Sequence, residues 1–165
     1  ITKQNNCCAN LEEVLERSLV IIKPDAIQRN LTGEIIRRLE TRGLRIVGAK
    51  FINVNQELAE KHYAIHKGKP FYNGLLKYIT SSPVMAMVWE GENAIKAIRQ
   101  TMGATDPLLA EPGTIRHDLS MKVSRNLTHA SDSSETAEKE IGLWFSPSEL
   151  VDWSFTSEAW IYGNN

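Results

Sequence analysis

The sequence predicts one domain that mixes helices and strands, arranged either as a doubly wound parallel sheet or as a ferredoxin-like α+β sheet. The chain has 165 residues, a length that fits a single domain with a sizeable core. Hydrophobic residues make up 42% and charged residues 24% of it, which is typical of a soluble globular protein. The predicted elements follow the order βαβαβαβα, and both sheet types accommodate that order. Residue periodicity alone does not choose between them.

Four segments have the residue pattern of strands, because each is short and rich in aliphatic or β-branched residues. The first is a continuous aliphatic run ended by Lys23-Pro-Asp25, which predicts a buried central strand followed by a turn. The four predicted strands are residues 18–22, 44–54, 84–89 and 119–124.

Helical periodicity marks the segments between these strands. In the first helix, Thr32 is a capping candidate and Gly43 a stop signal. The predicted helices are residues 32–42, 56–66, 71–79, 94–102 and 133–145, with a short helical turn at 147–151. Residues 104–117 form a long polar loop, and loops of that length inside a compact domain are usually functional. Residues 1–15, partly helix-like at 11–15, are interpreted as a flexible extension, so the domain itself spans residues 16–165.

Composition excludes several classes of partner. The net charge of −1 gives no reason to expect duplex DNA or an anionic membrane as a bulk electrostatic partner. No apolar run approaches the roughly 18 residues of a membrane span. The cysteines, Cys7 and Cys8, are adjacent and lie in the extension, so the domain is free of disulfides, which favours a reducing compartment. We therefore expect a cytoplasmic protein, or a mitochondrial or plastid one if the N-terminus is a processing product.

Residues 125–134 are the main candidate for chemistry. His129 sits there among small polar residues, directly before the predicted helix at 133–145. Near its start that helix carries three carboxylates, Glu135, Glu138 and Glu140. A neutral imidazole is a nucleophile at pH 7 when it is accessible and a carboxylate orients it. The competing interpretation of His129 is an ordinary, partly buried histidine.

Dispersed cations and aromatic residues are weaker candidates. Lys23 ends the first predicted strand, where ligands often meet α/β sheets, whereas a lone Arg99 or Arg116 is most often a solvated surface residue. Tyr63 and Phe71 could stack on a base, but an aromatic residue on a helix face is more often core. Glycine-rich phosphate-binding motifs are absent from the chain, and its histidines lack the spacing to cysteine of a zinc site. No metal site is predicted.

Several motifs, in order along the chain, resemble those of the nucleoside diphosphate kinase family. They are Lys23-Pro-Asp25, His62-Tyr63, Lys69-Pro-Phe71, Val88-Trp-Glu-Gly91, Pro112-Gly-Thr-Ile-Arg116, the segment from Asn126 through His129 to Ser133, and the segment from Glu138 to Phe145. The similarity runs without a visible gap from about Leu15 to Tyr162. It implies a ferredoxin-like α+β fold (βαββαβ), with a four-stranded antiparallel sheet and helices covering its faces. It also implies that the chain transfers the terminal phosphate of a nucleoside triphosphate, typically ATP, to a nucleoside diphosphate. The family does this by a ping-pong route through a phosphohistidine.

The resemblance also assigns roles. His129 matches the nucleophile, Glu140 matches the carboxylate that orients its imidazole, and Ser131 and Tyr63 are implied to lie near them. The implied ligands of phosphate and sugar are Lys23, Arg99, Thr105, Arg116 and Asn126. The implied apolar slot for the base consists of Phe71, Leu75 and Val123, and stacking without base-edge hydrogen bonds predicts little base selectivity. Mg²⁺ is expected to arrive on the nucleotide phosphates, with few or no direct protein ligands.

Three positions depart from the family pattern. Ala130, His117 and Ser124 stand where the family usually has glycine. If the glycine replaced by His117 has a positive φ, the replacement costs backbone strain. Ala130 is small, and we expect activity to survive it.

Two further expectations concern function and assembly. The alternative function is a catalytically weak family member that acts as a scaffold or binds nucleic acid. RNA-binding modules with a ferredoxin-like sheet use aromatic residues on their central strands, whereas the corresponding strands here are aliphatic, so nucleic-acid binding is disfavoured. The resemblance also implies homo-oligomers, hexamers or else tetramers.

Overall fold

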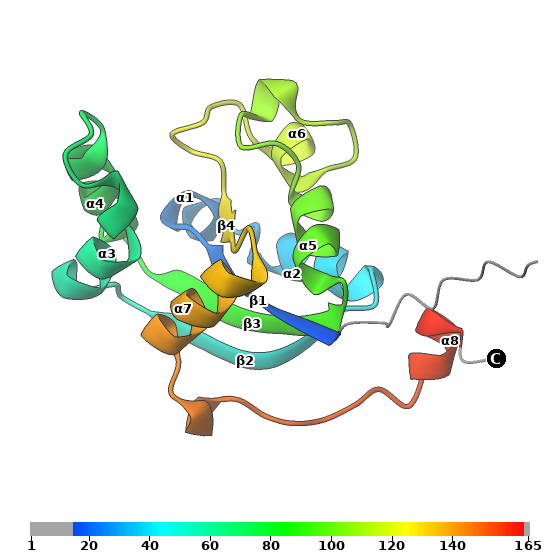
Figure 1. Ribbon diagram of the computed structural model, residues 1–165. Coiled ribbons are helices and arrows are strands. Elements are labelled where there is room, and N and C mark those ends of the chain that lie inside the picture. The colour runs from blue at the N-terminus through cyan, green and yellow to red at the C-terminus, as the bar shows by residue number, and fades with distance from the viewer. Residues whose placement is uncertain (1–14, 164–165) are drawn as a thin grey trace, which may run out of the picture.

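The computed structural model describes residues 15–163, in which four strands form one antiparallel sheet in the order β2-β3-β1-β4 (Figure 1). The strands are β1 (Leu15–Ile22), β2 (Arg45–Ile52), β3 (Val84–Glu92) and β4 (Thr128–Ala130). Strand β1 pairs with β3 and β4, β3 also pairs with β2, and every pair is antiparallel. With helices in the crossovers, this is the ferredoxin-like βαββαβ arrangement. That expectation is confirmed, and the doubly wound parallel sheet is excluded.

The α-helices of the described chain are α1 (Pro24–Gln28), α2 (Thr32–Thr41), α3 (Gln56–His62), α4 (Tyr72–Ile79), α5 (Ala94–Met102), α6 (Ile115–Leu119), α7 (Ser134–Trp144) and α8 (Glu158–Tyr162). Single 3₁₀ turns occur at Ala64–His66, Pro107–Leu109 and Pro147–Glu149. Helix α7 begins where the Ser133 hydroxyl accepts a hydrogen bond from the backbone N–H of Thr136, at 3.1 Å.

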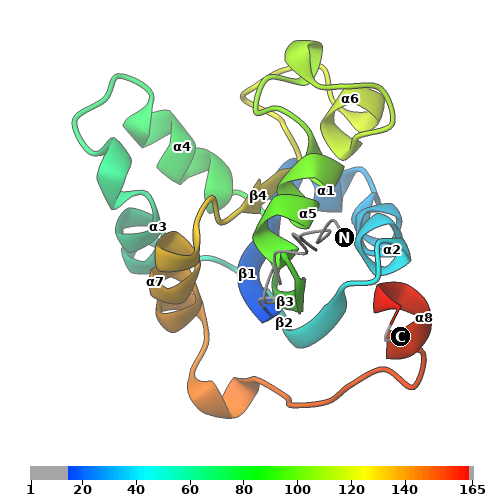
Figure 2. The same cartoon turned by 45° about the vertical axis from the view of Figure 1, so that its right-hand side comes forward.

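Each face of the sheet carries its own layer of helices (Figure 2). In β1, Leu19 and Ile21 pack against residues of α3, α4 and α7, while Val20 and Ile22 pack against residues of α2 and α5. All four side chains are fully buried. Successive side chains of a strand point to opposite faces, so a strand covered on both sides is apolar throughout. This explains why the first predicted strand is a continuous aliphatic run.

The predicted fourth strand at residues 119–124 is wrong. The Thr114 side chain caps α6, so the chain at Leu119 is still helical. Lys122 and Arg125 then form an isolated antiparallel bridge, and β4 begins at Thr128. This strand has three residues and directly follows Leu127, whose φ is +70°. A strand this short gives no periodicity that the sequence could reveal.

Smaller differences concern element boundaries. The predicted turn after the first strand is helix α1, and Thr32 is the first residue of α2 instead of its cap. The predicted helix at 56–66 is interrupted at Tyr63. Leu15, assigned to the extension, opens β1 opposite Glu92, whereas residues 1–14 lie outside the described part.

The positions that depart from the family pattern carry no unusual backbone. Among described residues other than glycine, positive φ occurs at Asn30, Asn93 and Leu127. His117 is not among them, so the condition under which its replacement of glycine would cost strain is not met.

The C-terminal segment runs along the edge strand β2 before it ends in α8 (Figure 1). Val151 N–H donates to the carbonyl oxygen of Val47 at 2.7 Å, and Trp153 Nε1–H donates to that of Ile46 at 2.8 Å. None of the helices within residues 15–163 is long and apolar enough to cross a membrane.

Candidate active site

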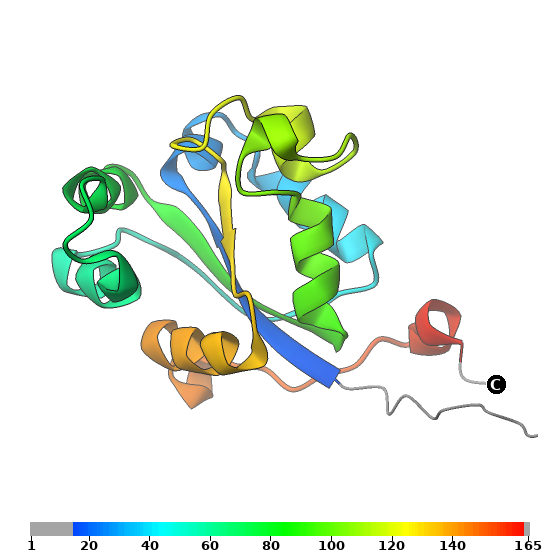
Figure 3. The same ribbon diagram turned by 45° about the horizontal axis from the view of Figure 1, so that its top comes forward.

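The register of β4 decides which way His129 points. His129 lies opposite Ile21 of β1, and residues directly opposite in an antiparallel pair share a face of the sheet. Ile21 faces α3, α4 and α7, so His129 does too. Ser131 follows directly after β4, and its hydroxyl bonds Glu140 of α7, the next helix along the chain (Figure 3).

Glu140 on α7 holds the imidazole of His129. The distance from His129 Nε2 to Glu140 Oε1 is 2.9 Å, and the Ser131 hydroxyl donates to Glu140 Oε2 at 2.6 Å. Ser131 is itself fixed, because its oxygen accepts the N–H of Leu19 at 3.2 Å. Burial alone would raise the pKa of Glu140, but the hydrogen bonds from His129 and Ser131 outweigh it and lower the pKa below its usual value. The structure thus brings together the predicted nucleophile, its carboxylate and Ser131.

A second histidine, His62 at the end of α3, packs edge-on against His129. Their ring centroids are 4.6 Å apart at 82°. Trp144 Nε1–H donates to His62 Nδ1 at 3.2 Å. Burial, followed in size by the effect of His129, lowers the pKa of His62 to about 3, so its ring is neutral. Sequence reasoning quoted His62 within a motif and gave it no role. Trp144 was detectable, since it lies four residues after Glu140 and therefore on the same helix face.

Tyr63 is buried beside His62, with ring centroids 4.6 Å apart. Its hydroxyl has no hydrogen-bond partner among the described residues. Burial raises the pKa of Tyr63 far above its ordinary value, so the hydroxyl keeps its proton. Tyr63 therefore offers an unused donor beside His62, whose ring packs against His129.

Lys23, Asn126 and Thr105 form one chain of hydrogen bonds at the end of β1. Lys23 Nζ donates to Asn126 Oδ1 at 2.8 Å, and Asn126 Nδ2 donates to the backbone oxygen of Thr105 at 2.9 Å. Burial and then the charge of Arg116 lower the pKa of Lys23 to about 8. A half-buried cation with a lowered pKa suits an anionic ligand, whose negative charge would raise that pKa again and favour the ammonium form. The backbone of Thr105 makes this contact, whereas its side chain is exposed.

The two predicted arginines differ in their surroundings. Arg116 is buried and donates to three carbonyl oxygens, those of Gly103 at 2.9 Å, Asn126 at 3.2 Å and Thr128 at 2.8 Å. Burial, with Arg99 as the second cause, lowers the pKa of Arg116 to about 10. Arg99 is exposed on α5 and donates to the oxygen of Ala130 at 3.4 Å. Arg116 thus links Gly103, directly after α5, to the two neighbours of Leu127 in the chain, Asn126 and Thr128.

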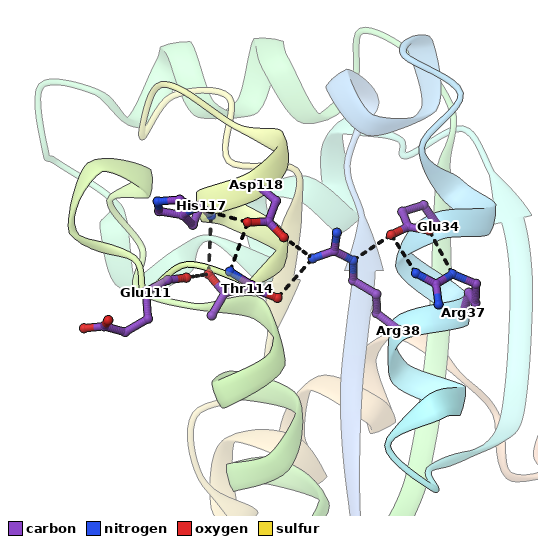
Figure 4. A network of polar contacts seen from close by, with 8 residues as sticks. Glu34, Arg37, Arg38, Glu111, Thr114, His117 and Asp118 are labelled. Atoms are coloured by element: carbon purple, nitrogen blue, oxygen red, sulfur yellow. Dashed lines mark hydrogen bonds and ion pairs between the residues drawn. The ribbon is translucent and has the colours of Figure 1, made fainter.

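An ionic network holds helix α6, which carries Arg116, and the loop before it (Figure 4). Arg38 of α2 donates to the carbonyl oxygen of Gly113 at 3.1 Å, to Asp118 at 2.8 Å and to Glu34 at 2.7 Å. Asp118 also accepts from the N–H of Gly113 at 3.0 Å. The long loop predicted at 104–117 is therefore clamped to α2 at its second half.

The residues predicted to hold a base come from two segments. Phe71 directly precedes α4 and is 53% exposed, and Val123, in the connection after α6, is 50% exposed. Leu75 is half-buried within α4. His66 lies edge-on to Phe71, with ring centroids 5.5 Å apart. Two half-exposed apolar side chains are accessible to a flat ligand.

Among the described residues, one group of three potential metal ligands is found: His62, His129 and Glu140, whose ligand atoms lie within 4.8 Å of one another. Two imidazoles and one carboxylate suit a borderline ion such as Zn²⁺. Mg²⁺ prefers oxygen atoms and keeps much of its water. This group is therefore not a Mg²⁺ site.

Known proteins resemble this chain over most of its length. A family model described as nucleoside diphosphate kinase matches residues 16–150. A nucleoside diphosphate kinase of Synechococcus sp. (strain JA-3-3Ab) is 55% identical over 148 residues, which cover 90% of this chain and 99% of the relative. The solved structure of a halophilic nucleoside diphosphate kinase from Halobacterium salinarum in complex with CDP has 52% identity and a TM-score of 0.87, covering 89% of this chain and 98% of that one. A nucleoside diphosphate kinase family protein from Babesia bovis has 43% identity and a TM-score of 0.86, covering 89% and 99%. The chain therefore belongs to the nucleoside diphosphate kinase family and is a phosphotransferase that acts on nucleotides.

Proposed function

We propose that the chain transfers the terminal phosphate of a nucleoside triphosphate to a nucleoside diphosphate in two steps, through a phosphohistidine on His129. The observation that carries this proposal is the hydrogen bond between His129 Nε2 and Glu140. A carboxylate can only accept, so Nε2 carries the proton and Nδ1 carries the lone pair. Glu140 thereby selects Nδ1 as the nucleophile.

In the first step Nδ1 forms a bond to the terminal phosphorus, and the bond from that phosphorus to the bridging oxygen breaks. The nucleoside diphosphate leaves with the electron pair of that bond. The imidazole gains positive charge, and Glu140 stabilises it through the proton on Nε2. In the second step a terminal oxygen of another nucleoside diphosphate attacks the phosphorus, and Nδ1 recovers its lone pair. No proton needs to leave the site in either step.

Positioning and charge provide most of the catalysis in phosphoryl transfer. We assign this role to Lys23, Arg99 and Arg116, with Tyr63, Thr105 and Asn126 as polar contacts to phosphate or sugar. The unused Tyr63 hydroxyl and the lowered pKa of Lys23 support the assignment. The Halobacterium relative was solved with CDP, which supports a nucleoside diphosphate as ligand.

Mg²⁺ is proposed to bind through the nucleotide phosphates and water, because the ligand group at His129 is rich in nitrogen. When bound, it would neutralise charge on the phosphate oxygens. The residues of the chain then need only bind and orient the phosphates.

The base is proposed to lie against Phe71, Leu75 and Val123. Stacking on an aromatic ring accepts any base, because every base has a π-face. Broad nucleotide use follows from this arrangement.

The alternative of a nucleic-acid binder is disfavoured further by the fold, since helices cover both faces of the sheet (Figure 2). RNA modules of this fold leave one face open.

Self-assembly into hexamers, or else tetramers, is also proposed. Exposed apolar side chains support it: Trp160 is 91% exposed, Leu109 75% and Leu108 73%. Light scattering should give a mass near six chains, and a monomer mass would contradict the proposal.

The catalytic unit is proposed to be residues 16–165. A cytoplasmic location of the protein stays a prediction, which is based on its cysteine content.

Phosphorylation by γ-labelled ATP tests the mechanism directly. The wild-type protein should gain an acid-labile, base-stable label, which ADP or CDP then removes. His129→Ala should take up no label. His117→Ala, a change at an exposed histidine on α6, serves as the matched control and should be labelled normally. An unlabelled wild type, or a labelled His129→Ala variant, would reject the phosphohistidine.

A further inference from the structure

The proposed nucleophile, His129, belongs to a group of three side chains whose geometry is nearly that of a transition-metal site. Tetrahedral zinc holds its ligand atoms about 3.4 Å apart, given bond lengths of about 2.1 Å. The ligand atoms of His62, His129 and Glu140 already lie within 4.8 Å of one another. Small movements of these side chains would therefore complete three ligands of a zinc ion. We propose that the hydrogen bond from Trp144 to His62 prevents zinc from binding to these three residues, which therefore form a latent zinc site.

The argument rests on which nitrogen of His62 carries its proton. The indole Nε1–H of Trp144 can only donate, so His62 Nδ1, at 3.2 Å, must present its lone pair to it. The ring proton of the neutral imidazole then sits on Nε2. This nitrogen is enclosed by protein and has no hydrogen-bond partner among the described residues. A protonated Nε2 cannot bind a metal, and the Nδ1 lone pair is already occupied by the indole.

Metal binding at the latent zinc site requires the other tautomer of His62. With the proton on Nδ1, two N–H donors would face each other across the 3.2 Å gap to Trp144, and a hydrogen bond would be lost. A buried donor without an acceptor is costly. Trp144 is itself buried, with 3% of its surface exposed, so it cannot turn away easily. The indole is thus a positioning residue that acts through the tautomer of His62.

The exclusion of metal ions from the latent zinc site matters for phosphoryl transfer, and this consequence rests on the proposed function. A metal between His129 Nε2 and Glu140 would displace the proton that they share, and the ring would hold its proton on Nδ1. The nitrogen proposed to attack phosphorus would then lack a lone pair. Trp144 therefore protects the nucleophile from divalent ions that bind imidazole.

Cobalt binding tests the proposal without any phosphoryl transfer, so its failure is distinct from failure of the proposed function. Co²⁺ is added to the 165-residue protein in the absence of nucleotide, and the visible absorption of four- or five-coordinate cobalt is recorded. Trp144→Phe should bind Co²⁺ at least tenfold more tightly than the wild type. The added change His62→Asn should remove that gain. Trp153→Phe loses an indole donor that bonds the oxygen of Ile46, so it is the matched control and should resemble the wild type.

A second measurement needs no variant at position 144. In long-range ¹H–¹⁵N spectra of the wild-type protein, the ring of His62 should show the tautomer with its proton on Nε2, assigned by its loss in His62→Asn. A proton on Nδ1 would overturn the proposal. Equal cobalt affinity of the wild type and a folded Trp144→Phe variant would overturn it as well. Zinc added before Mg-ATP should slow labelling of Trp144→Phe more than tenfold and leave the wild-type rate unchanged.

Discussion

Glu140 and Trp144 lie one turn apart on α7, and each is hydrogen-bonded to a different histidine of the site. Glu140 accepts from His129 at 2.9 Å, and Trp144 donates to His62 at 3.2 Å. Residues four apart share a helix face, so one helix sets both rings at a centroid separation of 4.6 Å. The carboxylate decides which nitrogen of the nucleophile is free, and the indole decides which nitrogen of its neighbour carries the proton.

Glu140→Gln should slow phosphoenzyme formation by roughly tenfold, because a hydrogen bond to a charged group contributes about 1.5–3 kcal/mol and a neutral one only about 0.5–1.5 kcal/mol. The amide keeps an acceptor for His129 but loses the negative charge that stabilises the imidazolium. The rate of label uptake at saturating ATP is the measurement. The affinity for ADP should change little, since Glu140 is proposed to hold the ring of His129 and not the nucleotide.

Glu138→Gln is the control for this change. Glu138 is exposed on the same helix and stands two residues away, so it faces a different direction. Its phosphorylation rate should equal that of the wild type. Equal rates for Glu140→Gln and Glu138→Gln would remove Glu140 from the mechanism.

Nucleotide affinity should fall above pH 8 because Lys23 loses its charge. Its pKa in the free protein is lowered to about 8, and phosphate binding needs the ammonium form. The dissociation constant for ADP should therefore rise by up to about tenfold per pH unit above that value. Calorimetry between pH 7 and 9.5 measures this slope.

Two variants frame the pH measurement. Lys23→Met should bind ADP more weakly at pH 7 and show no such slope. Lys61→Met removes an exposed lysine of α3 and should keep the wild-type slope. A flat wild-type profile over this range would mean that Lys23 does not bind the phosphates.

Much of the fold was predictable because its signals are local. The aliphatic run of β1 and the start and end of α5 were readable from residue types alone, and β1, buried on both faces, gave the strongest pattern. The sheet type was not, since pairing in β1 joins Leu15 to Glu92, far apart in sequence. Only the family resemblance selected the antiparallel order.

The site was predictable where it depends on motifs and not where it depends on packing. His129, Glu140 and Ser131 do meet, as the resemblance implied. The three backbone contacts of Arg116 could not be predicted, because every residue has a carbonyl oxygen and its residue type does not show whether that oxygen accepts a hydrogen bond from a side chain. The fourth strand was misplaced for a similar reason: Thr114 caps a helix whose end at Leu119 looks, by composition, like the start of a strand.

Arg38→Met should loosen the second half of the loop at 104–117. The side chain of Arg38 is 19% exposed and joins Glu34 of α2 to Asp118 of α6. Hydrogen bonds from Arg37 and then Arg38 lower the pKa of Glu34 to about 2, and hydrogen bonds from Arg38 and then His117 lower the pKa of Asp118 to about 2. The melting temperature at pH 7 should fall, and faster proteolysis within the loop should accompany the fall.

The pH dependence of this effect has a defined sign. A carboxylate whose pKa is lowered by folding stabilises the native state above its unfolded pKa, and that contribution is lost as pH falls through the folded value. The difference between the wild type and Arg38→Met should thus be constant from pH 7 to 5 and shrink between about pH 4 and 2. Arg37→Met, at a side chain 63% exposed, should show a smaller difference. A difference independent of pH would mean that Arg38 acts through packing and its hydrogen bond to the Gly113 oxygen, and not through the two carboxylates.

Asp25→Ala should destabilise the turn that places Asn126. Asp25 Oδ2 accepts the backbone N–H of Leu127 at 3.1 Å, and Asp25 Oδ1 accepts the hydroxyl proton of Tyr78 at 2.5 Å. Leu127 is buried with a φ of +70°, a conformation that persists only when its surroundings impose it. Removing the carboxylate leaves a buried N–H without an acceptor, which costs about 1–3 kcal/mol of the free energy of unfolding. Urea denaturation measures that loss.

Tyr78→Phe separates the two hydrogen bonds of Asp25. It removes the donor at 2.5 Å and leaves the contact to Leu127 intact, so the expected loss is only about 1 kcal/mol. Because Asn126 precedes Leu127 and accepts from Lys23, Asp25→Ala should also raise the KM for ADP, whereas Tyr78→Phe should not. Tyr72→Phe, on the same helix α4, is the control for loss of a hydroxyl. If Asp25→Ala and Tyr78→Phe lost equal stability and kept equal KM, Asp25 would be a partner of Tyr78 alone and would not hold the turn.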